Sequence, residues 1–218
     1  MTLTGNLTPS QSPSSGLDSE PAVYGPARLR DGTEIRVRHV TRGDEPVLLA
    51  FMRRLSPESR RLRFFSPACD VESAACWAAG ADGIDHLGLV AIDSHGQILG
   101  HAACVRMYGP RAEVAIEVDE TYRHQGLATL LITRLAREAE QKQIRSFVAE
   151  VLPDNHEMLA VFQDGFDASR QFADGEVDIE FPTTAWRLPA SRLADPHIEN
   201  PTCLSTSPSV ELGGDAFG

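Results

Sequence analysis

A short turn with two small residues stands directly before an amphipathic segment, in YRHQGLATLLITRLAREAE, residues 122–140. Gly126 and Ala128 leave little side-chain bulk at the point where a helix would begin. The first backbone N–H groups of a helix have no partner within it, and they carry the positive end of the helix dipole. An exposed helix start of this kind can hold a phosphate or a pyrophosphate. A glycine here is equally compatible with an ordinary tight connection from a strand to a helix.

Two common phosphate-binding motifs do not fit this turn. No lysine follows Gly126, as a P-loop would require, and the turn lacks the G-x-G-x-x-G pattern of dinucleotide-binding folds. If the turn binds an anion, it therefore does so by another scheme.

The surrounding patterns place the turn between a strand and a helix. AEVAIEV, residues 112–118, alternates as a half-buried strand does, with Ala112, Val114 and Ile116 on one face. Beyond the turn, apolar residues recur at helical spacing. They predict a helix whose buried face holds Leu127, Leu130, Leu131, Leu135 and Ala139.

Similar patterns along the chain predict an α/β (α+β) domain. Its centre is a mixed, mostly antiparallel sheet of six to seven strands, with helices on both faces. Asp154 or Asn155 is expected to cap the last helix, and Gly165 to end it. Further helices are expected at 41–55 and 56–65, and strands at 33–40, 144–152, 167–172 and 176–181 and on both sides of the turn 94–96.

The two ends of the chain differ from its middle. Residues 1–27 and 194–218 are rich in Ser, Thr, Pro and Gly and show no apolar period. Such segments cannot bury enough surface to offset the entropy of ordering, so we expect disordered tails there. Residues 28–193 are expected to form one domain.

Charge and composition exclude several classes of protein. A net charge of −11 argues against an extended nucleic-acid footprint and favours cationic partners. No apolar run approaches the ~20 residues of a membrane span, and the N-terminus does not resemble a signal peptide. The four cysteines form no C-x-x-C pair, which argues against a zinc site. We expect a cytoplasmic protein with reduced thiols.

RHQGLA, residues 123–128, resembles the R/Q-x-x-G-x-G/A motif of the GNAT family of N-acetyltransferases, which lies between a strand and an amphipathic helix. A second likeness runs from Asn155 through Met158 to Gly165-Phe166. Over about residues 34–190 the resemblance implies a GNAT fold. It also implies acetyl transfer from acetyl-CoA, as cosubstrate, to a primary amine, without a metal.

A narrower likeness concerns residues 29–67, which carry the run LSPES…RFF. They resemble the start of a bacterial GNAT group that includes Pat-type protein lysine acetyltransferases. The resemblance favours a protein with an exposed lysine as acceptor. A small amine, such as a polyamine, an amino acid or an antibiotic, is the alternative acceptor, and a non-catalytic acyl-CoA sensor is the alternative function. The oligomeric state stays open.

The GNAT resemblance implies binding roles for two groups of residues. Backbone amides of Gln125–Thr129 would hold the pyrophosphate, and backbone groups of Ile116–Val118 would bind the pantetheine arm. Asn155 would contact this arm near the thiol, cap its helix, or do both, and Arg123 would add a charge or be a solvated turn residue. The implied cofactor-binding residues are Ile116, Glu117, Val118, Arg123, His124, Gln125, Gly126, Leu127, Ala128, Thr129 and Asn155.

Acetyl transfer to an amine requires that the amine be neutral. A free lysine titrates near pH 10.4, so neutralising it at pH 7 costs roughly 4.6 kcal/mol. A carboxylate acting through water can take the proton. Glu113 matches the position of the base in the family's protein lysine acetyltransferases, and Glu117 is the second candidate on the same strand face. Both would otherwise be ordinary polar residues of a partly solvated strand.

Many GNAT enzymes protonate the leaving thiolate with a tyrosine on the last conserved helix. Here the matching position is Phe162, so the usual general acid is missing. Water or another group would supply the proton, or the thiolate would leave unaided, because a thiol with a pKa near 8.5 is a fair leaving group. Tyr108 and Tyr122 stand elsewhere in the chain.

Arginines also cluster at residues 53–63, where five occur in a strongly acidic protein. A solvated face of two helices accounts for them. They would otherwise contact an acidic partner or the 3′-phosphate of CoA.

Overall fold

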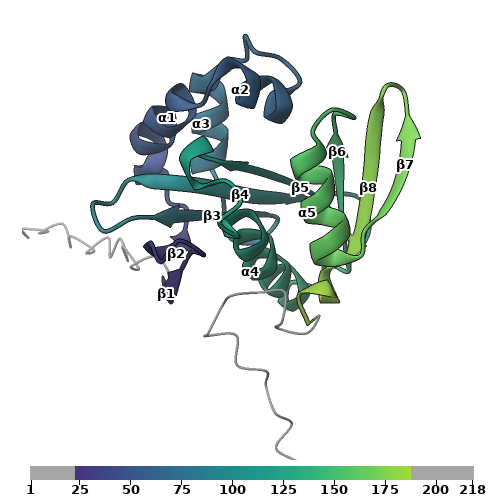
Figure 1. Ribbon diagram of the computed structural model, residues 1–218. Helices are drawn as coiled ribbons and strands as arrows, with labels where there is room; N and C mark the ends of the chain where they lie inside the picture. The colour runs from purple at the N-terminus through teal and green to yellow at the C-terminus, as the bar shows by residue number, and fades with distance from the viewer. Residues whose placement is uncertain (1–22, 188–218) are drawn as a thin grey trace, which may run out of the picture.

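The computed structural model describes residues 23–187. Eight strands form one sheet (Figure 1). They are β1 (Val23–Arg28), β2 (Glu34–His39), β3 (His86–Ile92), β4 (Ile98–Arg106), β5 (Arg111–Val118), β6 (Ser146–Val151), β7 (Ser169–Ala173) and β8 (Glu176–Pro182). The α-helices are α1 (Glu45–Arg54), α2 (Pro57–Phe64), α3 (Val71–Ala79), α4 (Leu127–Gln141) and α5 (His156–Phe166). Short 3₁₀ turns are η1 (Arg42–Asp44), η2 (Glu120–Tyr122) and η3 (Thr183–Arg187).

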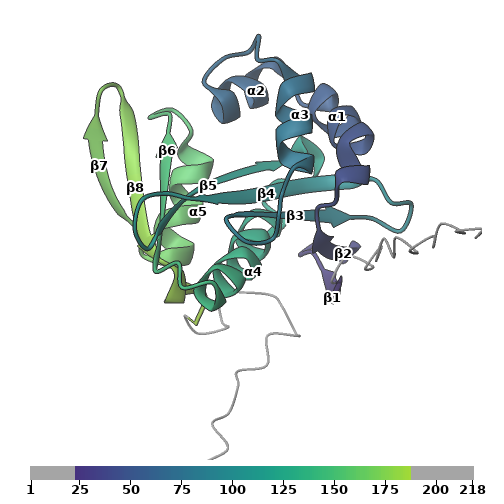
Figure 2. The same ribbon diagram turned by 180° about the vertical axis from the view of Figure 1, so that it is seen from behind.

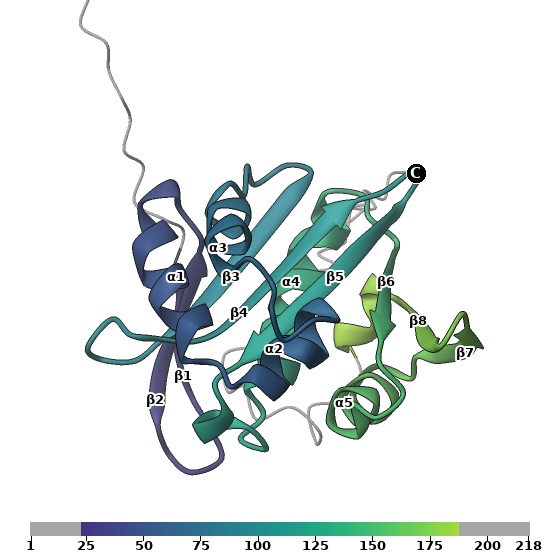
Figure 3. The same cartoon turned by 90° about the horizontal axis from the view of Figure 1, so that it is seen from above.

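The sheet is mixed and mostly antiparallel, as predicted. The strand order is β1-β2-β3-β4-β5-β6-β8-β7, and only the β5–β6 pair is parallel. Helices cover both faces: in Figure 3, α1 and α3 cross the near side of the sheet and α4 lies on the far side. One core cluster joins the sheet to α4 and α5, and the other joins it to α1 and α3.

The strand count exceeds the predicted six to seven because β1 lies inside the expected N-terminal tail. The structure therefore corrects the start of the folded part from residue 28 to Val23, while the predicted end at residue 193 lies outside the described residues. Gly25 and Pro26 interrupt any alternating pattern in this segment. They fall where the β1–β2 register shifts between Tyr24 and Ala27, at an edge where a proline is tolerated.

Helix α3 was not predicted. Its segment VESAACWAA is rich in alanine and gives only a weak apolar stripe. The side chain of Asp70 caps it by accepting a hydrogen bond from the Ser73 amide at 3.1 Å. Ala75, Ala78 and Ala79 are buried in the cluster that also holds residues of α1, so small side chains here allow two helices to pack closely.

Helices α4 and α5 follow the prediction more closely. All five residues expected on the inner face of α4 are buried. Asn155 caps α5, its side chain accepting a hydrogen bond from the Met158 amide at 3.2 Å. Gly165 does not end this helix: α5 runs to Phe166, and Asp167 stops it in a left-handed conformation with φ of 52°.

Strands β5 and β6 separate soon after they meet. Their pairing joins Arg111–Glu113 to Ser146–Val148, whereas β5 continues to Val118 and β6 to Val151. Figures 1 and 2 show β6, β8 and β7 turning away from the rest of the sheet as a separate wing. The split opens toward the starts of α4 and α5, which follow β5 and β6 in the chain.

Candidate functional site

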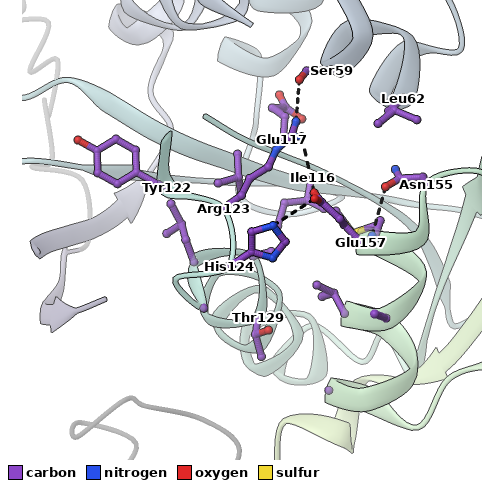
Figure 4. A pocket seen from close by; sticks show the side chains of 18 of the residues that line it. Ser59, Leu62, Ile116, Glu117, Tyr122, Arg123, His124, Thr129, Asn155 and Glu157 are labelled. Atoms are coloured by element: carbon purple, nitrogen blue, oxygen red, sulfur yellow. Dashed lines mark hydrogen bonds and ion pairs between the residues drawn. The ribbon is translucent and has the colours of Figure 1, made fainter. Parts of the chain in front are cut away.

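A cavity of about 940 Å³ lies at this split (Figure 4). Its walls come from the end of β5, the turn before α4 and the first residues of α4, helix α5 along most of its length, helix α2 and the turn between β1 and β2. Cavities that bind cofactors and small ligands are usually of this size or smaller.

The turn before α4 leaves the start of the helix open. Gly126 is the N-cap residue, with φ of 87°, a left-handed conformation that side chains disfavour. No side chain caps the helix, and its first turn holds no acidic residue. The first intrahelical bond runs from the Leu130 amide to the Gly126 carbonyl at 3.0 Å. The preceding amides of α4 therefore point beyond the helix start with the positive end of the dipole, as an anion site requires.

The structure brings nearly all predicted cofactor-binding residues together. Gln125 is the exception: it is not among the residues lining the cavity, and its carbonyl accepts a hydrogen bond from the Arg30 amide at 3.2 Å. The cavity wall includes Ile116, Glu117, Val118, Arg123, His124, Gly126, Leu127, Ala128, Thr129 and Asn155.

Arg123 lines the cavity, and neighbouring side chains hold its guanidinium. Its guanidinium donates to the Ser59 hydroxyl at 2.6 Å and lies 3.6 Å from a Glu157 carboxylate oxygen. His124 meets the same carboxylate at 3.1 Å. Figure 4 shows Arg123 between Ser59 and Glu157, so this arginine links α2, the turn and α5.

Glu117 belongs to the cavity wall but is buried in a charged cluster. One carboxylate oxygen accepts from Arg63 Nε at 2.7 Å, and the other lies 2.8 Å from His101 Nδ1. Burial raises the pKa of Glu117, but Arg63 and His101 outweigh it and bring this pKa down to about 2. The carboxylate is thus held ionised with both oxygens engaged.

Glu113 has a different environment. It is exposed, it does not line the cavity, and it is the last residue of β5 that pairs with β6. It shares a strand face with Glu117, about 13 Å along the strand at 3.3 Å per residue. The two candidate bases therefore stand at different points: Glu113 at the vertex of the split and Glu117 within it.

Phe162 faces away from the cavity. Its ring is buried and lies 5.3 Å from the Phe181 ring in the core under α5. The side chains that α5 presents to the cavity include Met158 and Val161. Tyr122 does line the cavity, beside the turn, whereas Tyr108 is 98% exposed in the β4–β5 loop and does not.

Several cavity residues were not predicted as cofactor ligands. Arg30 comes from the β1–β2 turn, and Ser59, Leu62 and Arg63 from α2. Nothing in the local sequence marks Arg30, because its contacts are with residues 94 or more positions away. The arginine cluster singled out Arg63 only as one of five cations.

Two further observations concern membrane-spanning helices and metal-binding groups among the residues described. No helix among them has both the length and the apolar character needed to cross a membrane. Residues 23–187 also hold no group of three His, Cys, Asp or Glu side chains arranged to hold a metal ion.

Comparison with known proteins decides the family. The profile of the Acetyltransferase (GNAT) family matches residues 51–166. The GNAT domain of S. lividans PAT is 33% identical over 72% of this chain and 96% of its own, with a TM-score of 0.67. The chain belongs to the GNAT acetyltransferase family. Its eight-stranded mixed sheet is a GNAT fold.

More distant GNAT structures share the fold. The cAMP-binding acyltransferase from Mycobacterium smegmatis is 24% identical over 72–73% of this chain in three structures, with TM-scores of 0.51 to 0.53. This chain spans only about 46% of that protein. The Salmonella typhimurium protein yncA, described as a candidate acetyltransferase with its cofactor acetyl-CoA, is 16% identical over 68% of this chain and 94% of its own, with a TM-score of 0.55.

Proposed function

We propose that this GNAT protein transfers an acetyl group from acetyl-CoA to a primary amine, with a protein lysine as the preferred acceptor. The observation that carries the proposal is the open start of α4, which faces a cavity running to the split between β5 and β6. The open start of α4 suits a negatively charged diphosphate, and the cavity that leads to the β5–β6 split suits a long thin arm.

The chain's own residues would hold acetyl-CoA at two places. The amides at the start of α4 would bind the diphosphate, and Ile116–Val118 would bind the pantetheine arm along β5, on the side where β6 no longer pairs with it. Acetyl-CoA supplies an activated acetyl group as a thioester. The amine nitrogen forms the new C–N bond, and the thiolate leaves.

Glu113 is the proposed base. It stands at the vertex of the split and is exposed, so an incoming amine and a bridging water can reach it. Glu117 suits a positioning role better. A carboxylate whose pKa is about 2 is a weak proton acceptor, and both of its oxygens already bind Arg63 and His101.

Negative charge around Glu113 supports a cationic acceptor. Burial raises the pKa of Glu150 on the next strand, and the nearby charges of Glu176, Glu113 and Asp178 raise it further. These carboxylates lie on the outer face of the β5–β6–β8 region, away from α5. A lysine ammonium would be attracted there before it loses its proton.

Release of free thiol from acetyl-CoA is the test. Purified protein is incubated with acetyl-CoA and, in separate arms, a mixture of bacterial proteins, a lysine peptide, a polyamine and amino acids. The proposal expects thiol release with protein acceptors, together with a mass increase of one acetyl group on lysine. Release with small amines alone would favour the small-molecule alternative. Binding of acetyl-CoA without turnover in any arm would favour the sensor.

A further inference from the structure

The turn between β1 and β2 touches the turn before α4. The Arg30 amide donates to the Gln125 carbonyl at 3.2 Å, and the Arg30 guanidinium donates to the His124 carbonyl at 3.3 Å. Arg30 also lines the cavity. An arginine from the N-terminal hairpin is thereby placed beside the open start of α4.

The hairpin is held against α4 at its other end as well. Glu138 of α4 accepts a hydrogen bond from the Tyr24 hydroxyl of β1 and lies 2.7 Å from His39 Nε2 of β2. Two separate contacts, one near each end of α4, therefore fix the hairpin along this helix. Arg30 therefore lies in the turn of a hairpin that contacts α4 and the turn before it at two places.

Among the three arginines of the cavity wall, Arg30 differs in its charge environment. Glu117 binds Arg63, and Glu157 lies against Arg123. Within residues 23–187, no carboxylate lies at ion-pair distance from Arg30, whose side chain bonds to a backbone carbonyl instead. Among residues 23–187, its positive charge is therefore the least compensated of the three.

Arg30 also lies close to where an anion would sit. A Cβ atom placed on Gly126, the N-cap of α4, would be 3.9 Å from Arg30 Nε. An anion on the first amides of α4 would occupy neighbouring space, within reach of the guanidinium. Arginine binds phosphate oxygens through charge-assisted hydrogen bonds.

We propose that Arg30 binds a phosphate of the ADP part of CoA, and that the β1–β2 hairpin forms the outer wall of the cofactor site. The inference rests on the proposed function, because it takes acetyl-CoA as the ligand. It adds a contact from outside residues 51–166, the segment that the family profile matches. The phosphate is either the diphosphate or the 3′-phosphate, and the test separates them.

The experiment measures binding by calorimetry, so it does not depend on catalysis. CoA, 3′-dephospho-CoA and pantetheine are titrated into the full chain and into Arg30→Gln, Arg30→Lys and Arg28→Gln. Arg28 is a matched control, because it lies on the same hairpin but outside the cavity wall. Melting temperatures are recorded for each variant.

Loss of a charge-assisted hydrogen bond corresponds to roughly 10- to 100-fold in affinity. Arg30→Gln should weaken CoA binding by this factor and leave pantetheine binding unchanged, while Arg30→Lys recovers part of the loss and Arg28→Gln shows none. A loss shared by CoA and dephospho-CoA assigns Arg30 to the diphosphate. A loss confined to CoA assigns it to the 3′-phosphate.

Unchanged CoA affinity in Arg30→Gln would overturn the inference. So would an equal loss for pantetheine, because it would show that Arg30 only supports the shape of the site. Failure of the parent protein to bind CoA would overturn both this inference and the proposed function. Normal CoA binding with the predicted Arg30 effect, but without acetyl transfer to any amine, would overturn the proposed function alone.

Discussion

At the scale of single residues, Gly126 meets two requirements: a left-handed backbone conformation and free space for a ligand at the start of α4. Its φ of 87° ends the turn and starts α4, and its missing side chain leaves the helix start open beside Arg30. A side chain at this position would be strained and would occupy the space that the cofactor needs. The backbone conformation and the open space therefore both require that residue 126 has no Cβ atom.

Gly126→Glu should therefore abolish binding of acetyl-CoA, since it adds bulk and a negative charge where a diphosphate would lie. Calorimetry on the folded variant measures this. Gly96→Glu is the control, because Gly96 has a similar φ of 80° in the turn between β3 and β4, away from the cavity wall. Unchanged affinity in folded Gly126→Glu would show that the cofactor binds elsewhere.

The two glutamates of β5 can be separated by amide substitutions. Glu113→Gln should lower the rate of acetyl transfer near pH 7 by about 10²–10⁴-fold, the usual contribution of a general base. Part of the rate should return at high pH, where more of the amine is already neutral. CoA affinity should stay the same, because Glu113 does not line the cavity.

Glu117→Gln should act on stability instead. It leaves Arg63 and His101 without their buried counter-charge, which commonly costs about 3–5 kcal/mol. Thermal melting and pH–rate profiles of both variants distinguish the roles. A stable Glu117→Gln protein without activity, beside a fully active Glu113→Gln protein, would make Glu117 the base.

At the scale of elements, the attachment of the β1–β2 hairpin to α4 depends on ionisable groups. Burial raises the pKa of Glu138 to about 7, although the charge of Lys142 lowers it. Tyr24 and His39 contact this carboxyl from the hairpin, and burial lowers the pKa of His39, as does Lys142. The guanidinium of Arg134 lies over the Tyr24 ring.

The sign of the Glu138 effect follows from its raised pKa. Between its unfolded value of 4.5 and about 7, the folded protein binds the extra proton, so Glu138 costs stability as pH rises through this range. The lowered pKa of His39 acts in the opposite direction, adding stability as pH rises. Because His39 contacts Glu138, the difference in melting temperature between a Glu138 variant and the parent includes the coupling between these two groups.

Glu138→Gln should therefore raise the melting temperature relative to the parent by a few degrees more at pH 8 than at pH 5. A change of 1 kcal/mol corresponds to about 2–4 °C in a domain of this size. The exposed Glu113→Gln variant is the control and should show no such difference. An equal gain at both pH values would mean that Glu138 is not protonated near neutral pH.

Elements whose apolar residues recur at a regular spacing could be predicted from the sequence, and elements without such a regular spacing could not. The alternating pattern of β5 and the apolar stripe of α4 were enough to predict both elements and the turn between them. Helix α3 escaped prediction because alanines provide little contrast between its faces. Strand β1 escaped because Gly25 and Pro26 break its pattern, and only pairing with β2 reveals it.

The residues of the site also fall into those that the sequence could reveal and those that only the structure reveals. Residues 123–129 and Asn155 could be found because they form local motifs at helix starts. Arg30 could not, because the fold alone brings the N-terminal hairpin to the turn. The engagement of Glu117 also needed the structure, since His101 and Arg63 come from β4 and α2. Sequence spacing placed both glutamates on one face but could not show that one is buried.

At the scale of the whole molecule, the start of the folded part decides which shortened chains keep the site. The expected boundary at residue 28 removes most of β1, including Tyr24, which binds Glu138, and the buried Ala27. It also makes β2 the edge strand of the sheet, paired only with β3. The hairpin that carries Arg30 would then lose its first strand, β1.

A chain of residues 23–193 should melt within a few degrees of the full-length protein, whereas a chain of residues 28–193 should lose roughly 2 kcal/mol or more, about 4–8 °C for a domain of this size. The shorter chain should also bind CoA more weakly, because Arg30 would no longer be fixed beside α4. Calorimetric melting and CoA titration of the two chains, side by side, measure both effects. Equal melting temperatures and equal CoA affinities would mean that β1 neither stabilises the sheet nor positions Arg30.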